Sequence, residues 1–427
     1  MGTALSGRRA NWAGNIVYRA SELARPADLS GVRAVVREHR QVRAVGAGHS
    51  FNRIADTPGV LVSLGGLPVE ISIDAERAAV TVPGGITYQD LAPRLTQAGW
   101  ALRTLASLPQ LTVAGACATA THGSGDGNGN LATQVSGMQL VTADGALRTL
   151  RRDSDGDRFR GAVVGLGALG VVATLTLDLV PFFEVRQYVY QGLPAAMLGS
   201  HFDEIFGSAY SVSVFTDWQG SRHRQVWVKQ RAGAAGSWRP GPRWMDATLA
   251  DQPLHPVPGQ PAENATEQLG VPGPWHERLP HFRAEATPSS GQELQSEYLL
   301  PRQRAAASFD ALASLASVLA PVLQICEIRT VAPDDLWLSP SYQRDTVALH
   351  FTWIKDTAAV TPVIAAIEHL LAPLGARPHW AKLFTTAPHA VRALYPRSAD
   401  FQQLLGDMDP AGKFRNSFVS KYFPAGT

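Results

Sequence analysis

The pattern of hydrophobic and polar positions changes its period several times within the first 180 residues. Leu29, Val32 and Val36 recur at the spacing of one helix face. Elsewhere, apolar runs and alternation with period two predict strands that are joined by glycine-containing turns. The predicted strands in this part of the chain cover residues 42–45, 69–73, 79–82, 134–142, 146–150 and 171–179.

The rest of the chain combines regular and irregular segments. Residues 232–291 are rich in proline and glycine, which indicates an irregular excursion from the fold rather than a linker. The tail at 385–423 carries polar and aromatic residues without a clear period, and no internal repeat is visible. The remaining patterns predict strands at 210–215, 225–229, 324–331 and 346–354 and helices at 305–323 and 363–374.

Composition narrows the class of protein. The 427 residues are 45% hydrophobic and 17% charged, as in a globular protein with a sizeable core, and the net charge of +2 forms no basic stripe for nucleic acid. Cys117 and Cys326 offer neither a disulfide framework nor the spacing of metal ligands. Residues 1–20 lack a signal-peptide pattern, and no apolar run reaches the roughly 20 residues of a membrane span. We therefore expect a cytoplasmic protein without a metal, a nucleic-acid partner or a membrane anchor.

One glycine motif is misleading. Residues 165–170 satisfy Gly-x-Gly-x-x-Gly, but a dinucleotide-binding Rossmann turn needs a strand before the glycines and a helix after them. Here the glycines precede the β-branched run at 171–177. We interpret the motif as a tight turn that feeds a buried strand, which argues against a nicotinamide-dependent enzyme.

Two other glycine-rich loops are better placed to bind a cofactor. Gly46–Asn52 follows a predicted strand, and its two glycines allow a nest of backbone N–H groups that can hold an anion. Gly115–Gly125 offers small residues where a flat ligand and its phosphates must approach the backbone closely. Taken alone, His49 in the first loop fits a turn residue with a satisfied ring equally well.

Polar residues alternate with apolar ones on two predicted strands. Glu327 and Arg329 share one strand face, and His350 and Thr352 share a face of the other strand. If the strands belong to one sheet, both polar pairs face a common cavity, and the alternative is a solvated face that carries an ion pair. Lys382 follows soon after, in His-Trp-x-Lys, and a lysine in such a place is more often a surface residue than a catalytic one.

Such a set of residues has a chemical use. Removal of hydride from an alcohol carbon requires the hydroxyl proton to leave, so a nearby base helps. A carboxylate and a guanidinium together bind the hydroxyls of a polyol. A fixed lysine stabilises the negative charge that develops at the pyrimidine end of a flavin during reduction.

Together these motifs resemble the vanillyl-alcohol oxidase superfamily of flavoproteins. The two glycine loops and the Glu-x-Arg, His-x-Thr and His-Trp-x-Lys elements occur in the family's order over nearly the whole chain. Within the superfamily the chain is most similar to bacterial alditol (xylitol and sorbitol) oxidases, whose relatives are the sugar-lactone oxidases. The resemblance implies oxidation of the terminal hydroxyl of an alditol to the aldose, with dioxygen reduced to hydrogen peroxide.

The resemblance also implies a fold and a set of site residues. The fold is α+β, with an FAD-binding domain of two α+β subdomains at 1–182, an antiparallel-sheet substrate domain at 183–384 and a tail at 385–427 that returns to the first domain. His49 is implied to carry FAD covalently. The other implied cofactor contacts are Val45, Gly46, Ala47, Gly48, Ser50, Ser107, Thr112, Gly115, Ala118, Thr119, Ala120, Thr121, His122, Gly123, the backbone near Val171, and Lys382 at the pyrimidine end. The implied substrate contacts are Glu327, Arg329, Thr352 and Ser107, with His350 as a base.

Two features leave the substrate open. The Gly-Ala-Gly lead into His49 looks more like the lactone oxidases, whereas the segment that begins at Glu327 (EIRTVAPDDLWLS) looks like the alditol oxidases. The alternative function is therefore an aldonolactone oxidase or dehydrogenase, and oxidase against dehydrogenase activity is open as well. A flavin carrier that binds its ligand without turnover is disfavoured, because the acid, the guanidinium, the histidine and the lysine occur together.

Overall fold

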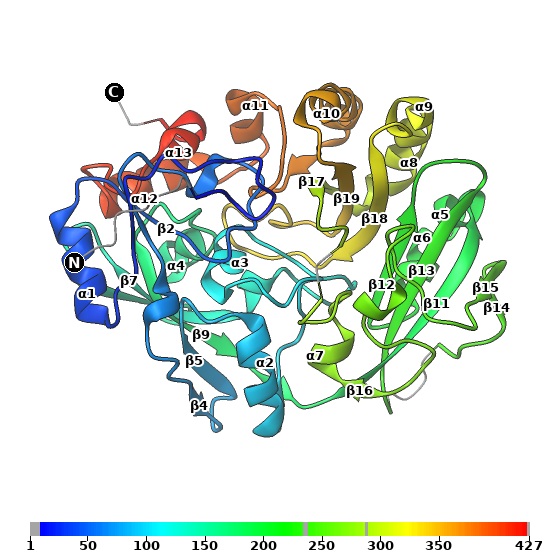
Figure 1. The fold of residues 1–427 in the computed structure, drawn as a ribbon, viewed down its shortest axis with the longest axis horizontal. Coiled ribbons are helices and arrows are strands. Elements are labelled where there is room, and N and C mark those ends of the chain that lie inside the picture. Colours follow the sequence, from blue (N-terminus) through cyan, green and yellow to red (C-terminus); the bar gives the residue numbers. More distant parts are fainter. Residues whose placement is uncertain (1–8, 234–237, 287–288, 425–427) are drawn as a thin grey trace.

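A computed structural model describes residues 9–233, 238–286 and 289–424. Positions 1–8 of the N-terminal stretch, and positions 234–237 and 287–288 of the predicted irregular segment, lie outside the described residues. Figure 1 shows two regions side by side, one built on small sheets and the other on one large sheet. The combination of helices with separate, mainly antiparallel sheets confirms the predicted α+β class.

The N-terminal region contains a parallel sheet, a larger antiparallel sheet, and a two-stranded pair of β6 (Trp100–Ala101) with β10 (Val180–Pro181). In the parallel one, β3 (Val60–Val62) lies between β1 (Glu22–Ala24) and β2 (Val42–Ala44), and α1 (Leu29–Glu38) packs on it. The antiparallel sheet has five strands, and α2 (Tyr88–Gln97), α3 (Val113–Ala118) and α4 (Gly156–Val163) share a core with it. Its strand order is β4 (Ser72–Asp74), β5 (Ala79–Pro83), β9 (Val171–Asp178), β7 (Val135–Val141) and β8 (Leu147–Arg151).

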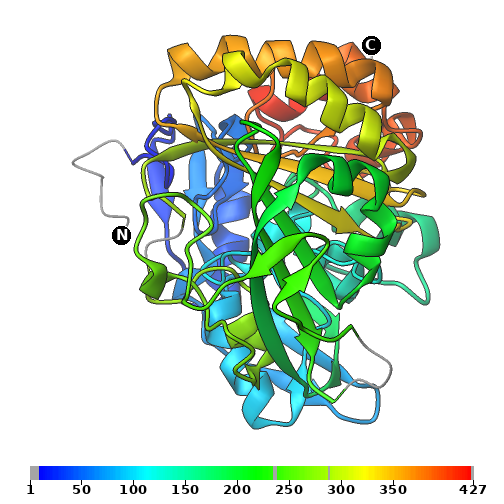
Figure 2. The same ribbon diagram turned by 90° about the vertical axis from the view of Figure 1, so that its right-hand side faces the viewer.

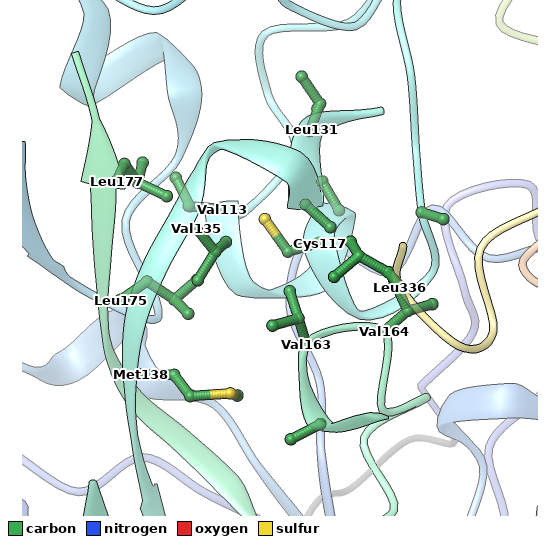
Figure 3. Packing of buried hydrophobic residues seen from close by; sticks show 14 of the residues in the cluster. Val113, Cys117, Leu131, Val135, Met138, Val163, Val164, Leu175, Leu177 and Leu336 are labelled. Carbon is green, nitrogen blue, oxygen red and sulfur yellow. The ribbon is translucent and has the colours of Figure 1, made fainter. Parts of the chain in front are cut away.

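The core beneath the five-stranded sheet is apolar and closely packed. Figure 3 shows Val113 and Cys117 of α3 facing Val135 of β7 and Leu175 of β9. All four side chains are at most 2% exposed. The packing of α3 in this core fixes the position from which the following loop extends toward the other region.

The second region is an antiparallel sheet of ten strands. Helices cover one of its faces, with α8 and α10 lying along it in Figure 2 (yellow and orange). The other face is turned toward the N-terminal region. The strand order is β14 (Arg243–Trp244), β15 (Ala247–Leu249), β11 (Glu184–Pro194), β13 (Arg222–Arg231), β12 (Ser211–Thr216), β18 (Leu323–Val331), β19 (Thr346–Ile354), β17 (Glu293–Pro301) and β20 (Arg377–Pro378), and β16 (Gly273–Pro274) pairs with β11. The covering helices are α5 (Ala195–Ser200), α6 (Phe202–Gly207), α8 (Ala305–Ser314), α9 (Ala316–Leu319) and α10 (Thr357–Leu371).

Residues 388–423 return to the N-terminal region. They form α11 (Pro388–Ala393), α12 (Ser398–Met408) and α13 (Ser417–Tyr422), whose apolar side chains join the same core as α2, α3 and α4. In Figure 1, α12 and α13 (red) lie near α1 and β2 (blue). The core of the N-terminal region therefore needs residues from both ends of the described chain.

The turn at 165–170 connects α4 to β9, as the sequence predicts, rather than a strand to a helix. Its carbonyl groups are bound by the buried Arg43. The guanidinium donates to Leu166 O at 2.7 Å and Gly167 O at 2.8 Å, to Phe414 O at 2.9 Å, and to Ile54 O. Burial lowers the pKa of Arg43 to about 10. The glycine motif is thus part of a structural clamp and not a nucleotide site.

Several predicted elements differ from the observed ones. The helix predicted at 305–323 is interrupted after Ser314 and forms α8 and α9. The helix predicted from residue 363 begins at Thr357, because the Asp356 side chain caps it by accepting from the N–H groups of Ala358 and Ala359. The tail, which shows no clear period in the sequence, forms three helices, and β17 was not predicted at all.

Residues 357–374 have the length and apolar composition of a membrane span, with a mean hydropathy of 1.5. Within this segment, Val360, Ile364, Ile367 and Leu371 are at most 1% exposed and pack against the ten-stranded sheet. Such packing is typical of the core helix of a globular domain, so length and composition alone are weak evidence for a membrane span.

Candidate active site

A cleft separates the uncovered face of the ten-stranded sheet from the loops of the N-terminal region. It holds about 1160 Å³ of empty space. Its walls come from the Gly46–Asn52 loop, the segment around α3, the irregular excursion, and β17, β18 and β19. Both glycine-rich loops and both predicted polar strand pairs therefore meet at one place.

The imidazole of His49 lies in this cleft without a hydrogen-bond partner. Both ring nitrogens are buried and unpaired among the described residues. The ring stacks on Trp12, with centroids 4.8 Å apart and an interplanar angle of 19°. Burial, followed by the charge of Lys382, lowers the pKa of His49 to about 4, so the ring is neutral. A neutral, buried and immobilised imidazole with free nitrogens is fit to attack an electrophilic carbon of a cofactor, and the alternative of a satisfied turn histidine does not match this geometry.

The backbone around His49 closely approaches Thr112, just before the second glycine-rich loop. Gly48 has φ +75°, a conformation that glycine adopts easily. A Cβ atom on Gly46 would overlap the hydroxyl of Thr112, which precedes α3. Only the absence of a side chain allows the two loops to form one continuous wall, which is what a flat cofactor and its phosphates require.

The two predicted strand pairs face the cleft. β18 and β19 are neighbours, and Glu327 lies directly opposite His350 in their register. Glu327, Arg329, His350 and Thr352 all line the cleft, while the intervening Cys326, Ile328, Phe351 and Trp353 are buried under the helices. The predicted division of the two strand faces is confirmed, and the alternative of a solvated face is excluded.

A buried ion pair that the sequence did not reveal lies next to these residues. Glu297 of β17 is opposite His350 in the register, and its Oε1 accepts a hydrogen bond from Arg329 Nη2 at 2.6 Å. Nε2 of His122 lies 3.1 Å from the same oxygen. Burial disfavours the ionised carboxyl, but His122 and Arg329 outweigh it and hold the pKa of Glu297 well below its usual range.

The side chain of Gln295 contacts both Lys382 and His350. Its amide oxygen accepts from Nζ of Lys382 and lies 3.1 Å from Nε2 of His350, while its amide nitrogen donates to Glu293. Because that oxygen can only accept, Nε2 of His350 carries the proton and Nδ1 is left as the basic atom. Burial lowers the pKa of His350 to about 3 and that of Lys382 to about 8. Lys382 is therefore part of the site and not a surface residue.

Most of the predicted site residues line the cleft, although their individual roles are predictions. Ala118, Ala120, Gly123 and Val171 are not in its wall. Gly123 borders a smaller adjoining cavity, and Val171 is buried in the core beside α1. The predicted residues in the wall are Val45, Gly46, Ala47, Gly48, His49, Ser50, Ser107, Thr112, Gly115, Thr119, Thr121, His122, Glu327, Arg329, His350, Thr352 and Lys382.

Five polar residues of the wall were missed by sequence reasoning, one of which is Ser289 of the irregular excursion. Gln295 and Glu297 belong to the unpredicted β17, His281 to the irregular excursion, and His379 to the His-Trp-x-Lys element of which only the lysine was singled out. For β17 a partial signal existed, since Glu293, Gln295 and Glu297 occupy alternate positions, although the polar Ser296 interrupts the apolar set between them. Nothing in the sequence around His281 indicates that it returns to the cleft.

Comparison with known proteins identifies two families within the chain. Residues 21–151 match the family described as FAD binding domain, and residues 290–422 match the family described as D-arabinono-1,4-lactone oxidase. A curated alditol oxidase from Streptomyces sp. is 53% identical over 96% of this chain and 97% of its own length. A curated L-gulono-1,4-lactone dehydrogenase from Mycobacterium tuberculosis is 28% identical over 96% of this chain and 98% of its own length.

Solved structures confirm the fold. Cholesterol oxidase from B. sterolicum superimposes with a TM-score of 0.77, covering 98% of this chain and 96% of its own, at 15% identity. That likeness concerns the architecture alone, which is the FAD-binding fold of the vanillyl-alcohol oxidase type. The specific relationship comes from the sequence match over nearly the full length. The chain belongs to the alditol oxidase family of FAD-dependent enzymes that oxidise CH–OH groups.

Proposed function

We propose that the protein oxidises the terminal hydroxyl of an alditol such as xylitol or sorbitol to the aldose and reduces dioxygen to hydrogen peroxide. The observation that carries this proposal is the match to an alditol oxidase at 53% identity over 96% of the chain. The polar wall of the cleft supports it, because a carboxylate, a guanidinium and a threonine hydroxyl face one space and can bind several hydroxyls together.

We further propose that FAD is bound covalently through His49. The unpaired, neutral imidazole supports this, as does the close approach of Gly46 to Thr112. The cofactor would be held by the Gly46–Asn52 loop and by the segment that contains Thr119 and Thr121. Bound FAD would supply the hydride acceptor and the site at which dioxygen is reduced.

In this mechanism the protein's own residues bind the substrate and move one proton. Glu327, Arg329 and Thr352 bind the hydroxyls that are remote from the reacting carbon, and Ser107 completes this wall. Nδ1 of His350 takes the proton of the reacting hydroxyl, since Gln295 already accepts from Nε2. With a pKa of about 3, the ring is unprotonated at every physiological pH, so Nδ1 keeps its lone pair.

Lys382 supplies a positive charge beside the reacting group. Its ammonium is fixed by Gln295 and lies 5.0 Å from the centre of the Phe51 ring. A charge held in place before reaction stabilises negative charge that develops in the transition state, without a cost of reorganisation.

The second candidate substrate is an aldonolactone, because residues 290–422 match the D-arabinono-1,4-lactone oxidase family. A peroxide assay over xylitol, sorbitol, L-gulono-1,4-lactone and a simple primary alcohol separates the possibilities. Peroxide from alditols supports the proposal, whereas turnover of the lactone alone contradicts it. Turnover with an artificial dye but not with dioxygen would identify a dehydrogenase instead.

The covalent link is tested separately. Acid-precipitated protein should stay yellow, and a flavin-bearing peptide that contains His49 should appear by mass spectrometry. His49→Ala should release its flavin into the supernatant while the loops still bind it. Complete release of flavin from the unmodified protein would contradict the covalent link without affecting the proposed substrate.

A further inference from the structure

A fully buried lysine lies behind the substrate wall and outside the cleft. Lys229 of β13 is 1% exposed and is not part of the cleft wall. Its Nζ donates to the carbonyl oxygens of Leu279 at 2.6 Å and Pro280 at 3.0 Å, and lies 3.0 Å from Nδ1 of His281. An ammonium has three protons and no lone pair, so these three contacts satisfy it completely. Nothing in the mechanism described above uses this residue.

His281 connects the lysine to the substrate wall. Its Nε2 lies 2.7 Å from Oε1 of Glu327, and both side chains are buried. Burial disfavours the ionised form of Glu327, but Arg329 and His281 outweigh it and hold the pKa of Glu327 well below its usual range. The carboxylate oxygen can only accept, so Nε2 must carry a proton.

The same contacts indicate that the positive charge lies on Lys229 and that His281 is neutral. Burial, followed by the charge of Lys229, lowers the pKa of His281 to about 4, which leaves the imidazole neutral. Its Nδ1 then has a lone pair and accepts from Lys229. Burial lowers the pKa of Lys229 well below its usual range, which Glu327 opposes. If the lysine were uncharged, its lone pair could hold the imidazole proton on Nδ1, and Nε2 would face Glu327 without a proton.

We propose that Lys229 is a positioning residue that fixes the tautomer of His281 and thereby holds Glu327 as an oriented, ionised acceptor for one substrate hydroxyl. This inference rests on the proposed role of Glu327 in binding substrate. Oε1 of Glu327 is occupied by His281, so Oε2 receives the hydroxyl. We call the series of contacts from Lys229 through His281 to Glu327 the relay. It fixes the orientation of the Glu327 side chain before the substrate binds.

The irregular excursion holds the relay in place. The N–H group of His281 donates to Ser107 O at 3.2 Å, and His281 O accepts from the Thr266 N–H group at 2.9 Å. The edges of Phe215 and Trp227 close around the imidazole, with ring centroids 5.5 and 5.2 Å away. The excursion therefore places the His281 side chain against the cleft face of the sheet, although His281 belongs to none of its strands.

The tautomer provides a test that does not depend on turnover. Histidine NMR with isotope-labelled ring nitrogens, assigned with His281→Gln, should show the proton of His281 on Nε2. In Lys229→Met that signal should move or broaden, because Glu327 alone then selects this tautomer and the lysine no longer blocks a proton on Nδ1. A proton on Nδ1 of His281 in the unmodified enzyme overturns the relay.

Kinetics with xylitol supply the second readout. Lys229→Met should raise KM about tenfold or more and change kcat less than about threefold, since the relay acts on binding rather than on the reacting carbon. In a Glu327→Gln background the same substitution should add little, because its effect passes through that carboxylate. An equal loss in both backgrounds would identify Lys229 as a merely structural residue and overturn the proposal, as would a normal KM in Lys229→Met.

Two His281 variants cover the case in which Lys229→Met fails to fold. The amide nitrogen of glutamine takes the place of Nε2 and can still donate to Glu327, so His281→Gln should keep most of the affinity for xylitol. His281→Leu should lose about ten- to a hundredfold in kcat/KM, as expected for one hydrogen bond to a charged group. Equal behaviour of the two variants contradicts the relay. If Glu327→Gln itself binds xylitol normally, the proposed role of Glu327 fails, and the NMR result still decides the tautomer.

Discussion

The titration of Lys382 links the geometry of the site to the pH dependence of the enzyme. Burial lowers its pKa to about 8, so the ammonium outnumbers the neutral amine by about ten to one at pH 7 and is outnumbered by about ten to one at pH 9. If the charged form carries the reaction, the rate constant for reduction of the bound flavin by xylitol falls through pH 8. Above that pH it decreases by about tenfold per unit.

The same reasoning predicts that protonation of His350, the proposed base, does not lower the rate constant for flavin reduction at the acidic end of the pH profile. His350 has a pKa of about 3 and is therefore neutral above about pH 4. The profile should therefore be flat between about pH 5 and 7. The assay is anaerobic stopped-flow reduction of the bound flavin, since steady-state turnover mixes this step with the reaction of dioxygen.

Two variants separate the lysine from other titrating groups. Lys382→Met keeps the length of the side chain but removes the charge, and should slow reduction by about a hundredfold, as for loss of one preorganised electrostatic partner. Its residual rate should no longer fall near pH 8. Lys382→Arg keeps a permanent charge, so its rate constant should also not fall above pH 8, whatever the value of that rate constant at lower pH. A methionine variant with the normal rate, or one whose rate constant still falls above pH 8, would refute the assignment of this lysine.

Two further predictions concern stability and cofactor content. Arg43→Leu removes the guanidinium donor from four carbonyl groups, of which the one of Ile54 keeps a second donor in Asn416, and should cost about 3–5 kcal/mol of unfolding free energy in urea. Arg33→Leu, which removes a bond to one carbonyl group at a half-buried position, should cost less than about 1.5 kcal/mol, and equal losses would contradict the clamp. Gly46→Ala places a methyl group against Thr112 and should lower the flavin content of purified protein, measured by absorbance. Gly199→Ala, which meets nothing within 4 Å, should not, and normal flavin content in both variants would show that the close approach is unimportant.

The sequence predicted the two central strands of the site well, because their alternation is strong. Residues 346–354 were predicted as a strand and form β19, with His350 and Thr352 on the cleft face. The apolar residues between them had to face a core, which fixed the direction of the polar ones. Resemblance to a family then supplied the loop residues, most of which do line the cleft.

The polar residues of β17 were not assigned to the site, because their burial on the cleft side cannot be inferred from their pattern in the sequence. Gln295 and Glu297 are at most 4% exposed, although alternating polar residues usually mark a solvated face. Periodicity reports which side of a strand is polar, but it cannot distinguish solvent from a closed cavity. His281 was missed for another reason, since its place depends on long-range contacts of an irregular segment that has no period at all.

The return of residues 388–423 to the N-terminal core has a consequence for biosynthesis. During synthesis the N-terminal strands and loops that line the cleft are made long before Phe414, whose carbonyl group is bound by Arg43. The ten-stranded sheet spans residues 184–378 and can assemble on the nascent chain before that point. The flavin-binding half is thus the part that is started first and finished last. A polypeptide stalled before α13 should therefore contain the folded ten-stranded sheet next to an N-terminal core that lacks part of its apolar packing.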